Sequence, residues 1–172
     1  ISAAPFDDEH AIEEIIIIST RNFRSFEQQP TRIEVLGGEE INEKANMKPG
    51  DIRMLLNEMT GVHVQQTSAT SFNSNIRIHG LSGKYTQLLR DGMPLYGGFS
   101  SGLGLLQIAP LDLHQVEIIK GSNSTLYGGG AIAGLVNLVT KKPGEEPETS
   151  LLFNATSAGG VDISAFNSSQ TN

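Results

Sequence analysis

The chain contains no cysteine and no tryptophan among its 172 residues. Without cysteine, neither a disulfide framework nor a thiolate metal site can form. Aromatic residues make up 6% of the chain and hydrophobic residues 38%, which suits one domain with a modest core. Lysine and arginine number 12 against 19 acidic residues, for a net charge of −7. Nucleic-acid binding requires clustered basic side chains, so we expect no nucleic-acid partner.

Long apolar stretches are also missing, because the longest run of large aliphatic residues is 15–18. A transmembrane helix needs about 20 apolar residues, so none is predicted. The four histidines (His10, His63, His79 and His114) show no metal-ligand spacing. We therefore expect no metal, no cofactor and no enzymatic activity.

The glycine-rich segment 116–143 is the most informative part of the chain. It places an alternating apolar stretch (116–120) before a Gly/Ser/Tyr turn and a second apolar stretch (135–140) after it. Glycines beside strands indicate positive φ angles or close contact between two backbones. The run 128–134 is also related to the dinucleotide-binding fingerprint, which needs a strand directly before it and a helix after it. Seven residues separate the first strand from Gly128 and a β-rich stretch follows, so nucleotide binding is not expected.

Composition divides the chain into three parts. Residues 1–31 are predicted to be a flexible, acidic N-terminal segment, and residues 32–143 the folded domain. Residues 144–172 begin with a charged, proline-containing linker. Two alternating segments after that linker resemble the first hairpin of a membrane β-barrel. We expect residues 149–172 not to form a membrane strand pair in isolation, so an ordered hairpin packed on the sheet would contradict this expectation.

Helix and strand patterns are clearest in the middle of the domain. Residues 33–36 predict a short strand and residues 39–45 a short helix. A second helix should begin with Asp51 as its N-cap and stop near Gly61. Its apolar positions repeat at helical spacing and predict one buried face. Those positions are Ile52, Leu55, Leu56 and Met59.

Further signals predict strands and turns. Residues 76–79 alternate as a strand, and residues 110–114 look like one helical turn that leads into the strand 115–120. The pair Asp91-Gly92 supplies the two positive φ angles of a type I′ turn and predicts a β-hairpin.

Four ordered blocks resemble the plug domain of TonB-dependent outer-membrane receptors. They are DIRMLLNEMTGVHV, NIRIHGL, LLRDGMPLYGG and VEIIKGSNSTLYGGGAIAGLVNLVTKKP, all within residues 32–143. The resemblance implies an α+β fold, with a small mixed sheet of about four strands and short helices. It also implies a plug that fills the lumen of a 22-stranded barrel in the cell outer membrane, with its N-terminus in the periplasm.

The implied function is gating of energy-coupled uptake, with no chemistry on the substrate. The implied partners are the C-terminal domain of TonB, the barrel of the parent receptor and a small-molecule ligand. An iron-siderophore, haem, cobalamin or a carbohydrate would fit the family equally. A soluble periplasmic binding or signalling module with a plug-like fold and no barrel remains the alternative. A parent gene that continues far beyond Asn172 would favour the receptor, and a stop codon there would favour the free module.

The N-terminal run 12–21 resembles the TonB box of the family. A flexible β-branched segment can add as a strand to a partner sheet through main-chain hydrogen bonds. An ordinary edge strand of the plug is the competing interpretation. The predicted TonB-contacting residues are Glu13, Glu14, Ile15, Ile16, Ile17, Ile18 and Ser19.

Two polar loops, 65–75 and 96–104, correspond to the ligand-facing loops of the family, although either could be a plain surface loop. The predicted ligand-facing residues are Thr67, Phe72, Asn73, Tyr96, Phe99 and Ser100.

Plug-to-barrel contacts are where this chain departs from the family. Arginines that usually pair with barrel glutamates are replaced by His79 and Lys120, with Arg77 as a possible substitute. Lysine keeps the charge but loses the two-pronged guanidinium geometry, and histidine is charged only at lower pH. Arg77 could equally be a solvated residue on a strand face.

Overall fold

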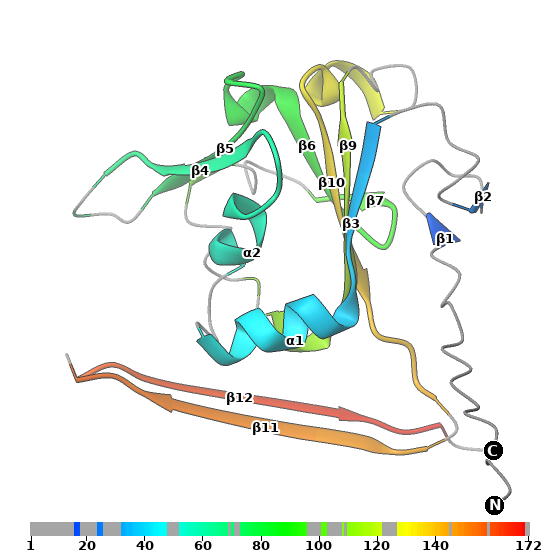
Figure 1. Cartoon of the computed structure of the whole chain (residues 1–172), viewed down its shortest axis with the longest axis vertical. Helices are drawn as coiled ribbons and strands as arrows, with labels where there is room; N and C mark the ends of the chain where they lie inside the picture. The colour runs from blue at the N-terminus through cyan, green and yellow to red at the C-terminus, as the bar shows by residue number, and fades with distance from the viewer. Residues whose placement is uncertain are drawn as a thin grey trace, which may run out of the picture.

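A five-stranded mixed sheet forms the centre of the computed structural model (Figure 1). Its order is β3 (Arg32–Leu36), β9 (Leu113–Lys120), β10 (Gly134–Thr140), β6 (Thr86–Arg90) and β7 (Met93–Pro94). The central strand β10 runs antiparallel to β9 and parallel to β6. The expected mixed sheet with short helices is therefore confirmed, with four longer strands and the two-residue β7 at one edge.

The structure describes twelve stretches of the chain, and the account below is confined to them. They are residues 16–17, 24–25, 32–47, 52–68, 70, 73–95, 101–102, 108, 110–121, 127–144, 146–157 and 159–170. Within them, no helix is both long and apolar enough to cross a membrane.

Two helices and a second sheet lie on one side of the central sheet (Figure 1). The helices are α1 (Gly38–Met47) and α2 (Arg53–Asn57). The second sheet joins β4 (Val62–Gln66), β5 (Ser74–Ile78) and β8 (Ser101–Gly102), all antiparallel. Three short 3-10 turns complete the domain. They are η2 (Gly83–Tyr85), η4 (Pro110–Asp112) and η5 (Gly128–Ala131).

The main core lies between the central sheet and the helices. Ile41 of α1 and Leu56 of α2 are fully buried with Ile118 of β9 and Val136 of β10. The neighbouring residues Ile119 and Leu135 point the other way and pack with Leu89 in a smaller cluster. Both faces of β9 and β10 are thus largely buried, and the polar side chains on them that are buried, Gln115, Glu117 and Asn137, are hydrogen-bonded to one another.

Helix α2 follows the predicted pattern at its apolar face but not at its start. Ile52, Leu55, Leu56 and Met59 are all buried. The N-cap position is held by Ile52, without a side-chain cap bond, rather than by Asp51. Gly61 adopts a φ of 72° in the turn between α2 and β4, so it does help to redirect the chain.

The turn signals are confirmed. Asp91 and Gly92 have φ angles of 50° and 77° and connect β6 to β7, as a type I′ hairpin requires. The triple glycine forms the short turn η5, and strand β10 follows it directly. A dinucleotide site would need an α-helix at that point.

The expectation that residues 149–172 would not pair in isolation is wrong. Strands β11 (Glu148–Ala155) and β12 (Val161–Ser168) form an antiparallel hairpin of eight residue pairs. The side chains Leu151, Phe153, Val161 and Ile163 remain 59–74% exposed on it. An isolated two-stranded hairpin is only marginally stable in water, and here β12 also contacts η4 of the domain.

Lys141 connects this hairpin to the domain. Its backbone N–H donates to the Asp112 carbonyl at 2.8 Å, and its Nζ donates to the Glu148 carboxylate at 2.6 Å. The Nζ also lies 5.2 Å from the centre of the Phe166 ring, a cation–π distance.

The hydrogen bond from Lys141, together with its charge, holds the pKa of Glu148 below its ordinary value of 4.5. The pKa of the Glu148 carboxyl is thus lower in the folded chain than in the unfolded chain. Its ionised form therefore stabilises the fold at pH values above the unfolded pKa. This stabilisation is lost as the pH falls through the folded pKa. The Lys141→Met variant should therefore raise the Glu148 pKa, as followed by NMR titration. The control Lys142→Met, at an exposed position, should leave it unchanged. An unaltered Glu148 pKa in Lys141→Met would contradict the assignment.

Candidate functional site

The N-terminal run contributes a two-residue strand that stays apart from the central sheet. Strand β1 (Ile16–Ile17) pairs antiparallel with β2 (Arg24–Ser25), in a separate two-stranded sheet. Within the described residues it is therefore not an edge strand of the domain. The other residues predicted for TonB contact lie outside the described part of the chain: Glu13, Glu14, Ile15, Ile18 and Ser19.

The first predicted ligand-facing loop is closed at its base by Thr67 and Asn73. The Thr67 N–H donates to the Asn73 carbonyl at 2.7 Å, and the Thr67 Oγ1 lies 3.2 Å from the same oxygen. The loop therefore leaves the hairpin directly after its last ladder pair, Gln66 with Ser74. The remaining predicted loop residues lie outside the described stretches: Phe72, Tyr96, Phe99 and Ser100.

Residues 98–102 read Gly-Phe-Ser-Ser-Gly and so match the Gly-x-Ser-x-Gly pattern of a nucleophile elbow. Such an elbow requires a turn from a strand into a helix at the serine. Here Ser101–Gly102 form strand β8, which pairs with β5. The two described residues after the serine of the pattern are thus strand, whereas an elbow continues into a helix. Among the described residues, no three metal-ligating side chains cluster either.

Arg77 is held on the polar face of the β4–β5 hairpin. It lies opposite His63 in the ladder, and its Nε is buried with no hydrogen-bond partner among the described residues. A buried guanidinium N–H normally has an acceptor. Among the three predicted barrel-contact residues, Arg77 is therefore the one whose side chain has a buried donor, Nε, without an acceptor in the described part of the chain.

His79 occupies a turn. Its φ is 51°, its N–H donates to the Gly61 carbonyl at 3.0 Å, and its side chain is exposed. The imidazole lies beside Gly61, where an added Cβ would meet the ring at 3.4 Å.

Lys120 has a partner inside the domain. Its Nζ pairs with the Glu34 carboxylate, across the β3–β9 ladder. The other oxygen of Glu34 accepts the Thr60 N–H at 3.1 Å. The Lys120 side chain is only 10% exposed, so its charge is already accounted for within the chain. Its predicted contact with a barrel remains a prediction.

Lys120→Met should lower the free energy of unfolding by about 1–2 kcal/mol, because the half-buried Glu34 carboxylate then lacks its countercharge. Urea unfolding of the 172-residue chain measures the effect. Lys142→Met removes the same type of charge from an exposed position and should change stability little. Equal losses in the two variants would argue against a stabilising Lys120–Glu34 pair.

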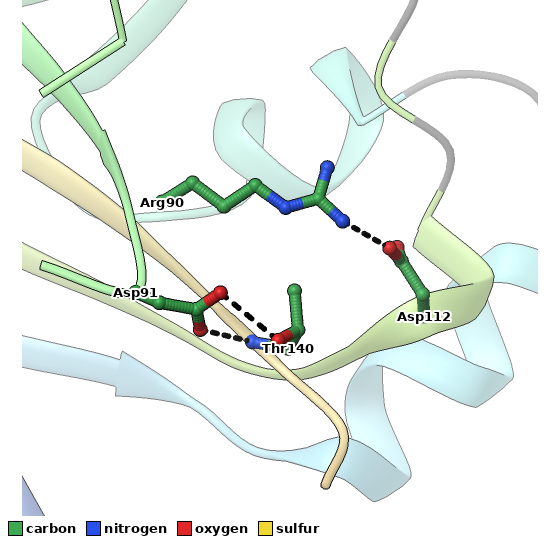
Figure 2. Close-up of polar contacts among 4 residues, drawn as sticks. All are labelled: Arg90, Asp91, Asp112 and Thr140. Carbon is green, nitrogen blue, oxygen red and sulfur yellow. Dashed lines mark hydrogen bonds and ion pairs between the residues drawn. The ribbon is translucent and has the colours of Figure 1, made fainter. Parts of the chain in front are cut away.

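A second polar cluster lies where β10 leaves the sheet (Figure 2). The Asp91 carboxylate accepts the Thr140 N–H at 2.8 Å and the Thr140 hydroxyl at 3.0 Å. Next to it, Arg90 forms an ion pair with Asp112 of η4. Asp91 thereby binds the β6–β7 turn to the end of β10, next to Lys141, and Arg90 binds η4 to β6.

Buried polar groups continue this cluster into the sheet. The Gly92 N–H donates to Asn137 Oδ1 at 2.9 Å, and Asn137 Nδ2 donates to Glu117 at 3.0 Å. Gln115 donates to the other Glu117 oxygen at 2.8 Å. Asn137 and Glu117 are both 0% exposed. Sequence reasoning used Asp91 and Gly92 only as turn formers and assigned no role to these partners.

Comparisons with known proteins agree with this fold. The sequence model of the TonB-dependent receptor plug domain matches residues 25–135. The ferric aerobactin receptor of Escherichia coli is 32% identical over 131 residues, which cover 76% of this chain and 15% of that receptor.

Two solved structures show the same arrangement of elements. The FpvAI–pyocin S2 complex matches 90% of this chain and 20% of its own, with a TM-score of 0.69 and 20% identity. A ferric enterobactin receptor variant of Pseudomonas aeruginosa, bound to enterobactin, matches 72% of this chain and 19% of its own, with a TM-score of 0.55 and 25% identity.

The aerobactin and enterobactin proteins are named as receptors. This chain spans 15% of the length of the curated aerobactin receptor. The family match covers more than half of the sequence, including every predicted block up to the start of β10. On that basis, the chain belongs to the plug domain family of TonB-dependent receptors.

Proposed function

We propose that this chain gates an outer-membrane receptor that takes up a ferric siderophore with energy delivered by TonB. The observation that carries the proposal is the plug-family match over residues 25–135. The aerobactin-receptor relative and the enterobactin-bound structure support an iron-siderophore over haem, cobalamin or a carbohydrate. The same resemblance supports a place inside a barrel in the outer membrane.

The TonB contact is proposed for residues 13–19. Among the described residues, strand β1 is two residues long and pairs with β2 alone. A two-stranded ladder this short is marginal in water, so its release for pairing with a TonB sheet requires little free energy. The polar stretch ending at Pro30 separates this run from the domain that starts near Arg32.

Arg77 is the proposed contact with the barrel wall, since its buried Nε lacks an acceptor within the described residues. A carboxylate from the wall would supply a charge-assisted hydrogen bond. Loops 65–75 and 96–104 are the proposed ligand-facing surface, with Thr67 and Asn73 holding the first loop closed.

Deletion of residues 13–20 in the full-length receptor tests the proposal. We expect loss of affinity for the purified TonB C-terminal domain and loss of ferric aerobactin uptake by cells. Ile16→Pro should have the same effect because proline cannot donate a main-chain hydrogen bond. The control Ile16→Val keeps the strand preference and should retain both. Unchanged TonB affinity after the deletion would remove the interaction site from this segment.

A further inference from the structure

The turn between β6 and β7 contains the one Asp-Gly pair of the chain, Asp91-Gly92. Such a pair is chemically reactive, because glycine has no side chain to shield its main-chain nitrogen from the neighbouring carboxyl group. Attack of that nitrogen on the carboxyl carbon closes a five-membered succinimide ring, and opening of the ring by water can leave an isoaspartate. Water reaches this turn, since Asp91 is exposed and Gly92 is half-buried.

Strand β10 holds both groups that would react (Figure 2). The N–H and the hydroxyl of Thr140 donate to the two carboxylate oxygens of Asp91, at 2.8 and 3.0 Å. The Gly92 N–H, which belongs to the attacking nitrogen, donates to Asn137 Oδ1 at 2.9 Å. The Asp91 N–H also donates to the Leu138 carbonyl, at 3.0 Å. The carboxylate and the N–H that ring closure requires are therefore both hydrogen-bonded to β10.

Within the described residues, the other attachments of this turn are short. Strand β7 has two residues, lies at the edge of the central sheet and forms two ladder pairs with β6. Leu95 adds one main-chain hydrogen bond to Leu88, at 2.9 Å. Met93, which follows the turn, is 70% exposed, so its side chain is not fixed in the core. Release of the end of β10 would therefore leave the Asp91 carboxyl and the Gly92 nitrogen free to approach each other.

We propose that Asp91 is a site of isoaspartate formation and that docked β10 keeps it unreacted. In the reaction, the Gly92 nitrogen forms a bond to Asp91 Cγ. One carboxyl oxygen leaves as water, with the amide proton and one proton from solvent. Water then opens the ring, and opening at the main-chain carbonyl of Asp91 leaves the chain running through Cβ and Cγ. The mass of the chain is unchanged, and no oxidant or reductant takes part.

The hydrogen bonds to β10 oppose the first step of this reaction. Attack requires the nitrogen and the carboxyl carbon to come within about 3–3.5 Å of each other in alignment. The Asp91 side chain would have to turn away from Thr140, and the Gly92 N–H would have to leave Asn137. Both movements break hydrogen bonds that the docked strand supplies.

Isoaspartate would prevent the turn from forming again. It lengthens the main chain by one carbon atom, whereas a two-residue type I′ turn requires set φ angles at both of its residues. The displaced carboxylate would also no longer meet Thr140. The altered turn would be a substrate for an isoaspartyl methyltransferase, the class of enzyme that methylates such displaced carboxyl groups. This chemistry does not depend on the proposed uptake function.

Incubation of the 172-residue chain at neutral pH, folded and in concentrated guanidinium chloride, tests the proposal. Isoaspartate is measured by methyl transfer from labelled S-adenosylmethionine with an isoaspartyl methyltransferase, and fragment mass spectrometry locates it. We expect isoaspartate at residue 91 in the unfolded chain and formation at least about tenfold slower in the folded chain. Equal rates would overturn protection by the fold. No isoaspartate at residue 91 in the unfolded chain would overturn the site itself.

Substitutions on β10 separate its role from general stability. Thr140→Val removes the hydroxyl donor but keeps the main-chain N–H, so isoaspartate should form about fivefold faster, the factor that one hydrogen bond contributes. Asn137→Ala removes the acceptor of the Gly92 N–H and should act in the same direction. If Asn137→Ala does not fold, Thr140→Val still tests the proposal.

Thr149→Val is the matched control for Thr140→Val. It makes the same chemical change at an exposed position on β11, where the hydroxyl accepts from Asn167 Nδ2 at 2.7 Å. This control should form isoaspartate at residue 91 at the unsubstituted rate. Equal rates in Thr140→Val and Thr149→Val would overturn the protective role of β10.

Discussion

Gly134→Ala is expected to lower the free energy of unfolding by about 3–5 kcal/mol, a loss large enough to unfold many domains. Gly134 begins β10 with a φ of 145°, a conformation that residues with a Cβ rarely adopt. An added Cβ would overlap the Ile119 carbonyl oxygen of β9 and lie 3.3 Å from Ile78 Cδ1. The overlap is with a backbone atom of β9, so no side-chain rotation can relieve it.

Urea unfolding of the 172-residue chain measures this loss. Gly129→Ala is the matched control, because an added Cβ there meets nothing within 4 Å and its φ is not positive. The control should change stability by less than about 1 kcal/mol. Similar stabilities for both variants would show that β9 and β10 approach each other less closely at Gly134 than described above.

Asn137→Ala is expected to lower the free energy of unfolding by about 3–4 kcal/mol. Asn137 is 0% exposed and joins two elements, since it accepts the Gly92 N–H and donates to the Glu117 carboxylate. Alanine would leave the Gly92 N–H without this acceptor and remove one donor from a buried carboxylate. The loss at Glu117 occurs away from water, where an unmade hydrogen bond has its largest effect, and the Gly92 N–H is part-buried.

Asn42→Ala is the matched control for this variant. Asn42 lies at an exposed position on α1, where alanine favours the helix slightly. Unfolding in urea should show a large loss for Asn137→Ala and no loss for Asn42→Ala. A loss below about 1 kcal/mol for Asn137→Ala would mean that water replaces its hydrogen bonds, contrary to its burial.

Local patterns in the sequence predict those features that depend on local geometry. Helical spacing identifies the buried face of α2, because Ile52, Leu55, Leu56 and Met59 are neighbours on one face. The Asp91-Gly92 pair predicts its own turn, since few other residues adopt two successive positive φ angles.

Contacts between distant parts of the chain could not be predicted in this way. Lys120 and Glu34 are 86 residues apart, and only the pairing of β3 with β9 brings them together. Asp91 and Thr140 are 49 residues apart and meet because β10 lies beside β6. Charge and hydropathy do not encode strand order, so these partners became visible only with the sheet topology.

The hairpin β11–β12 shows a different limit. Its alternating pattern was recognised, but the absence of the rest of a barrel led to the incorrect expectation that it would not pair. Eight ladder pairs and the contact of β12 with η4 hold the two strands together. The ladder forms although several apolar side chains of the hairpin remain exposed to solvent.

The central claim is that residues 32–143 close the lumen of a wider receptor. Ion conductance of the full-length receptor in a planar lipid bilayer tests it most directly, against a variant that lacks those residues. The account predicts that the intact receptor is closed and that the shortened variant forms a large, continuously open pore. An intact receptor that conducts as well as the shortened variant, or a shortened variant that inserts and stays closed, would contradict the claim.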